Sequence, residues 1–141
     1  MAYWIYQMSA KYWLPERYRT DVWEGNDTIW DVNKISPTGD PPRPGDILVL
    51  FYAKAGVAVA DRGIYGWAII MWHEDGEVRF RPTPPSDYLK MNPLWNDEIN
   101  YIINQIRGRM PRGTMWKVDD NLMERLREKI AQHVYGKHLS P

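Results

Sequence analysis

Runs of apolar and aromatic side chains predict β-strands in the first part of the chain. Residues 3–8 carry apolar or aromatic side chains on both faces, which favours a central strand. Residues 47–52 form a continuous apolar run after the turn residues Gly45 and Asp46, a pattern typical of a buried strand. A further strand is predicted over residues 64–72, with an interruption at its glycine.

A β-hairpin is predicted directly after these strands. Residues 73–77 carry turn chemistry, with Asp75 and Gly76 at the tip, and this dipeptide is a strong hairpin signal. Residues 78–81 return as the second strand, with Arg79 and Arg81 on one side, and the prolines that follow are expected to end it.

The hydrophobic period changes to that of a helix after the hairpin. Asn96 is a predicted N-cap, the helix is expected to stop near Gly108, and residues 114–118 read as a short extended piece. The apolar side chains on one face of this helix are Ile99, Ile102, Ile103 and Ile106.

A second helix is predicted near the end of the chain. It begins after Asp119 or Asp120 and ends near Gly136. A shorter helical turn is expected within residues 12–20. The apolar face of the last helix consists of Leu122, Met123, Leu126, Ile130 and Val134.

The order of these elements predicts the α+β class. Strands precede the two long helices without strand–helix alternation, which favours a small, strongly curved sheet or barrel with helices packed around it. The chain has 141 residues, so we expect one domain over residues 1–136 and a flexible tail over 137–141. It has no cysteine, no apolar run of membrane-spanning length and no signal-peptide pattern, so a cytoplasmic location without membrane association is expected.

Residues 21–45 are predicted to form a long irregular connection. Loops of this length are uncommon in compact domains and usually serve a function. This one carries Trp23 and Trp30 together with an amide, Asn26, and several carboxylates. Aromatic faces hold flat heterocycles by stacking, worth about 1–3 kcal/mol per base, and polar groups can read the ring edge. The alternative is that both tryptophans close over the core as lids.

The aromatic composition also favours binding. The chain has eight tryptophans and nine tyrosines but only two phenylalanines, and residues that pair an apolar ring with a polar group are frequent at binding surfaces. Core packing is nevertheless the expectation for the tryptophans on or next to predicted regular elements, which are Trp4, Trp67, Trp72, Trp95 and Trp116.

The charge pattern limits electrostatic binding to one segment. The chain has 18 basic and 18 acidic residues, so a broad basic footprint is absent. One stretch carries four cations and no acid, and it is a candidate for phosphate contacts or simply a solvated helix end. Its cations are Arg107, Arg109, Arg112 and Lys117.

The sequence contains no recognisable catalytic motif. A cysteine nucleophile, a phosphate loop and metal-ligand spacings are absent. His73, His133 and His138 are spaced unsuitably for a metal site, so neither a cofactor nor a metal is expected.

The order of several short motifs resembles the EVE domain, a branch of the PUA-like superfamily related to the YTH and ASCH domains. The first strand ends near Ser9, a Trp-Asp-Val-Asn segment spans residues 30–33, and Pro44-Gly45-Asp46 opens the buried strand. Residues 63–68 fit a glycine-containing barrel strand. The match covers mainly residues 3–72.

The resemblance implies a PUA-like barrel with a pocket for a modified base in DNA or RNA. Ser9, Trp30, Asp31 and Asn33 would line or support this pocket. A nuclease partner subunit would be consistent with such a reader. The residues around Trp23 resemble a second, incomplete copy of the tryptophan motif.

Two further hypotheses remain open at the level of sequence. Tyr65 and Trp67 would share a strand face that could look into the pocket if Gly66 does not bulge. Resemblance to ASCH proteins would instead suggest a small hydrolase or ribonuclease, for which Lys54 and Glu74 are the candidate residues. A third hypothesis is a module whose exposed aromatics dock another protein.

Overall fold

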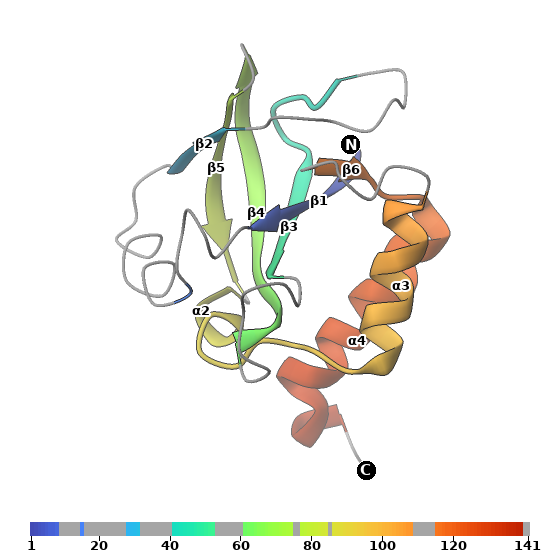
Figure 1. Ribbon diagram of the computed structural model, residues 1–141. Helices are drawn as coiled ribbons and strands as arrows, with labels where there is room; N and C mark the ends of the chain where they lie inside the picture. The colour runs from blue at the N-terminus through green and yellow to red at the C-terminus, as the bar shows by residue number, and fades with distance from the viewer. Residues whose placement is uncertain are drawn as a thin grey trace.

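The computed structural model describes residues 1–8, 15, 28–31, 41–52, 61–74, 77–84, 86–108 and 115–139. These residues form an α+β fold in which a mixed sheet is covered on one face by helices (Figure 1). The strands are β1 (Tyr3–Met8), β2 (Thr28–Asp31), β3 (Ile47–Tyr52), β4 (Gly63–Glu74), β5 (Glu77–Thr83) and β6 (Met115–Lys117). The helices are α2 (Ser86–Leu89), α3 (Asp97–Arg107) and α4 (Asp120–Leu139).

The sheet has six strands in the order β2-β5-β4-β3-β1-β6. The pair β1–β3 is parallel, and the other neighbours are antiparallel. β1 therefore lies between two strands, as its apolar character on both faces predicts. No pairing joins the outer strands β2 and β6 within the described part of the chain.

Each face of the sheet carries its own core cluster. Alternate residues of β1 divide between them, because successive side chains on a strand point to opposite faces. The helix cluster joins β1, β3, β4 and β6 to the helices and includes Ile5, Phe51, Ile102, Trp116 and Leu126. Among the described residues, the members of the sheet cluster all come from strands: Trp4, Tyr6, Met8, Leu48, Leu50, Tyr52, Tyr65, Ala68, Ile70, Val78, Phe80 and Met115.

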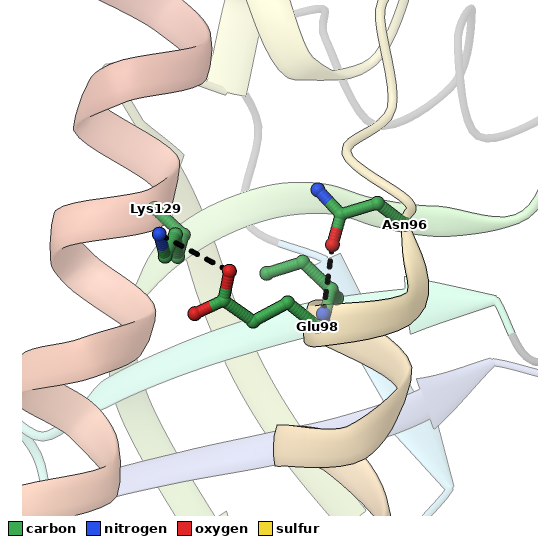
Figure 2. Close-up of polar contacts among 4 residues, drawn as sticks. Asn96, Glu98 and Lys129 are labelled. Carbon is green, nitrogen blue, oxygen red and sulfur yellow. Dashed lines mark hydrogen bonds and ion pairs between the residues drawn. The ribbon is translucent and has the colours of Figure 1, made fainter.

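Helices α3 and α4 lie side by side over the helix cluster (Figure 1). The Asn96 side-chain oxygen accepts a hydrogen bond from the backbone N–H of Ile99 at 2.9 Å, which confirms the predicted N-cap. Close to this cap, Glu98 pairs with Lys129 of α4 at 3.1 Å (Figure 2). Asp119 caps α4 by accepting from the N–H groups of residues 121 and 122.

The structure corrects two element boundaries and adds one short helix. α4 continues to Leu139 rather than ending near Gly136, because one glycine lowers helix stability by only about 1 kcal/mol and does not force an end. β5 includes Pro82 and ends at Thr83. The sequence pattern does not predict α2, since its four residues are too few to show a helical period.

Asp46, directly before β3, forms hydrogen bonds with the N-terminal residues of the chain. Its carboxylate is buried and accepts hydrogen bonds from the N–H groups of Ala2 (2.9 Å) and Arg43 (3.0 Å) and from the Trp4 indole (3.0 Å). Burial alone would raise the pKa of this carboxyl, but the three donors and the positive N-terminus outweigh it and lower the pKa below its ordinary value. Asp46 is therefore a structural carboxylate rather than a proton donor.

Candidate nucleic-acid interface

The segment that carries Trp30 and Asp31 is a strand of the sheet. Residues 28–31 form β2 and pair antiparallel with β5, so the prediction of an irregular chain is wrong for these four residues. Thr, Ile and Trp suit a strand, but four residues are too few to reveal it without the partner that β5 provides.

The register between β2 and β5 shows which β5 residues lie opposite Trp30 and Asp31. Trp30 pairs with Val78, and Asp31 pairs with Glu77 at the hairpin end of β5. Directly opposed residues occupy the same face of an antiparallel pair. The Trp30 position therefore belongs to the face that carries the sheet cluster, of which Val78 is a member.

The pocket candidate Tyr65 is a core residue. It is fully buried, its hydroxyl donates to the Asp61 carbonyl at 2.7 Å, and its ring meets that of Tyr52 edge-on at 5.0 Å between centroids. It does not share a face with Trp67, because the β3–β4 register shifts at Tyr65 and leaves the two on opposite faces. The glycine-associated bulge thus settles an alternative that the sequence leaves open.

The remaining members of the predicted pocket lie outside the described residues. These are Ser9, Trp23, Asn26 and Asn33. The same holds for Lys54, one of the two residues named for a hydrolase. The other, Glu74, is exposed at the end of β4, where its register partner is Glu77.

The basic stretch lies at the opposite edge of the sheet from β2. Lys117 ends β6, the outermost strand on the other side, and lines a depression of about 500 Å³ with Met1, Ala2, Tyr3, Val118, Asp119 and Asp120. Arg107 holds its guanidinium 5.7 Å from the centre of the Trp116 ring. Arg109 and Arg112 lie outside the described residues. The structure thus does not bring Arg107 and Lys117 together with the β2 segment.

The tryptophans predicted to be core residues fall into three groups. Trp4 and Trp116 are buried, as expected. Trp67 and Trp95 are partly buried and pack against the helix cluster. Trp72 belongs to neither cluster, and the prediction of a core position is wrong for it. It is half-buried beneath the Arg79 guanidinium, 5.8 Å from the ring centre.

The described residues hold no group of three or more His, Cys, Asp or Glu side chains able to bind a metal ion. His133 instead joins α4 to the turn after α2. Its Nε2 lies 2.7 Å from the Asn92 carbonyl oxygen, and its ring meets Tyr88 edge-on. His73 lies in β4 and is half-buried, and the side chain of His138 is not described.

None of the helices in the described part of the chain combines the length and apolar character needed to cross a membrane. No protein-family model and no curated protein matches the sequence.

Solved structures share the fold. The chain is similar to the protein Rpa0253 from Rhodopseudomonas palustris, with 12% identity, a TM-score of 0.51 and coverage of 100% of this chain and 97% of that one. It is also similar to the protein PSPTO5229 from Pseudomonas syringae, with 11% identity, a TM-score of 0.50 and coverage of 90% and 98%. At these identities the likeness shows that the α+β arrangement recurs in bacterial proteins of nearly the same length.

Proposed function

We propose that this protein binds nucleic acid and recognises a modified base, with Trp30 as the principal stacking residue. The observation that carries the proposal is the position of β2. The Trp-Asp pair that resembles the EVE motif is held at a defined register beside β5, and the Trp30 position belongs to the sheet face opposite the helices. A stacking residue on a strand is positioned more precisely than one in a loop.

The proposal includes a strongly curved, PUA-like arrangement of the sheet. The sheet cluster supports it because strands β1, β3, β4, β5 and β6 all contribute buried residues to one cluster, and every described member of that cluster comes from a strand. Ser9 and Asn33 would then supply polar groups that read the ring edge, and Asp31, whose position alternates to the other face of β2, would support the pocket segment.

The near-neutral net charge of the protein limits how it could attract nucleic acid. With 18 basic and 18 acidic residues, bulk electrostatic attraction contributes little. Selectivity for a modified base would therefore come from the pocket, while a small number of local cations would contact the flanking phosphates.

The test is a binding measurement with paired oligonucleotides that differ only in one methylated or hydroxymethylated base, at stated salt. Trp30→Ala is expected to lower the affinity for the modified strand about 5- to 150-fold, because one stacked base is worth about 1–3 kcal/mol. Binding of the unmodified strand should stay unchanged. Trp23→Ala tests the other tryptophan of residues 21–45 in the same way.

The matched control is Tyr101→Ala, which removes an aromatic side chain that is 57% exposed on α3, away from the sheet cluster. This variant should bind as the wild type does. Equal affinities of wild type and Trp30→Ala for every modified strand would show the pocket assignment to be wrong.

A further inference from the structure

The outer side of the β4–β5 hairpin carries an exposed surface that combines cations with apolar side chains. This surface, called here the outer hairpin face, consists of Ile69, Met71, Trp72, Arg79 and Arg81. Ile69 pairs with Arg81 and Trp72 pairs with Arg79, so both arginines share a face with the apolar residues. The hairpin end of these strands projects beyond the helices (Figure 1).

A β-bulge enlarges the apolar half of this face. The β4–β5 register shifts between Ile70 and Trp72, which leaves Met71 as an extra residue on β4. Met71 remains 38% exposed and Trp72 is half-buried. Bulges redirect side chains and are frequent beside binding sites.

Strand β5 separates this surface from the core. Val78 and Phe80 are fully buried in the sheet cluster, whereas Arg79 and Arg81 are exposed. Within the described part of the chain, no carboxylate forms an ion pair with Arg79, whose guanidinium lies over Trp72. The acids on these strands, Glu74 and Glu77, are register partners at the hairpin end.

We propose that the outer hairpin face binds the backbone of a single nucleic-acid strand next to the recognised base. Arg79 and Arg81 contact successive phosphates, and a flanking base packs against Met71 and Trp72. The inference rests on the proposed function and extends it. It supplies phosphate contacts beside β2, whereas Lys117 lies at the far edge of the sheet.

Three features favour a nucleic acid over an acidic peptide. Alternate strand positions are about 7 Å apart, which suits neighbouring phosphates of an extended strand. Arginine presents a planar fork that binds phosphate and carboxylate alike, but it also stacks on the rings of bases, which an acidic peptide lacks. The apolar half of the face would be left uncovered by carboxylates, whereas bases have flat faces that pack on aromatic and apolar side chains. Arg79 is also the register partner of Ile29, so the face adjoins β2 on the side opposite the Trp30 position, and a bound strand reaches both by passing around the β2 edge of the sheet.

The experiment measures the affinity of the full chain for modified and unmodified single strands across a salt series. For the double variant Arg79→Gln/Arg81→Gln, the slope of log affinity against log salt should fall by about 1.4, since each phosphate contact on a single strand contributes about 0.7. Both strands should weaken by the same factor, so their affinity ratio stays constant. Arg79→Lys/Arg81→Lys should retain most of the slope.

Matched controls come from α4 and from the turn after α2. Arg125→Gln removes an exposed cation from α4 and should leave the slope unchanged. Met71→Ser should lower affinity at every salt concentration without altering the slope, whereas Met91→Ser, at a residue that is 60% exposed, should have no effect. Thermal unfolding of each variant verifies the fold.

The outcomes separate this inference from the proposed function. An unchanged slope in the double glutamine variant, while Trp30→Ala still removes the preference for the modified strand, overturns the outer hairpin face and leaves the proposed function standing. An equal loss in Arg125→Gln also overturns it. Binding of polyglutamate in place of the oligonucleotides, or no binding of any strand by the wild type, contradicts both.

Discussion

The Asp46 carboxylate holds the first residues of the chain against β3 through three donors, the N–H groups of Ala2 and Arg43 and the indole of Trp4. Hydrogen bonds to a buried charged group contribute about 1.5–3 kcal/mol. A carboxylate has only acceptors, whereas an amide in its place would turn an N–H group toward one of these donors. The residue is thus suited to its site only in the ionised form.

Asp46→Asn is expected to lower the free energy of unfolding by about 2 kcal/mol at neutral pH. The folded pKa of Asp46 lies below its unfolded value, so its contribution is fully present above the unfolded pKa and is lost as the pH falls through the folded pKa. The difference between wild type and variant should therefore shrink below about pH 5. Urea unfolding across pH measures it. Glu124→Gln on the exposed side of α4 is the control, and a difference that persists unchanged to strongly acid pH would refute the assignment.

Gly63 admits no side chain. Its φ is +124°, and an added Cβ would lie 2.7 Å from the carbonyl carbon of Leu94, whose backbone pairs with Ile64. Gly63→Ala should cost more than about 3 kcal/mol or prevent folding, since both strain and a backbone clash act together. Gly136→Ala, whose added Cβ would meet nothing within 4 Å in α4, should instead stabilise by up to about 1 kcal/mol. Two melting temperatures that shift in the same direction would contradict this account.

At the scale of elements, the helices depend on local caps as well as on the helix cluster. Asn96→Ala removes the acceptor for the Ile99 N–H and should lower stability by about 1 kcal/mol. Asn100→Ala, an exposed change inside the same helix, should be neutral or slightly stabilising because alanine has the higher helix propensity. Chemical denaturation compares the two variants, and equal effects would argue against a specific role for the cap.

At the scale of the whole molecule, the strand order places the two candidate binding regions at opposite edges of the sheet. β2 adjoins β5, whereas β6 adjoins β1 on the far side. If β2 and β5 form the interface, binding of a modified strand should slow amide hydrogen exchange in residues 28–31 and 77–81 and leave α4 unchanged. Protection confined to β6 and α3 would move the interface to the basic stretch.

Much of the fold follows from local pattern. The strands β1 and β3, the Asn96 cap and the apolar faces of α3 and α4 are predicted from the sequence, because hydrophobic period and capping chemistry are properties of neighbouring residues. β2 and α2 are missed because each has four residues. An element that short is stabilised by its partner rather than by its own sequence.

The candidate site shows the same division. The sequence by itself determined which residue types are present: the aromatic surplus, the Trp30-Asp31 pair and the alternation of Arg79 and Arg81. Only the tertiary structure determined which residues lie next to them. Pairing between β2 and β5 places Trp30 opposite Val78. A bulge in β4 directs Tyr65 into the core. A second bulge places Met71 and Trp72 beside the arginines. Register and bulges depend on contacts between residues far apart in the chain, and no local period encodes them.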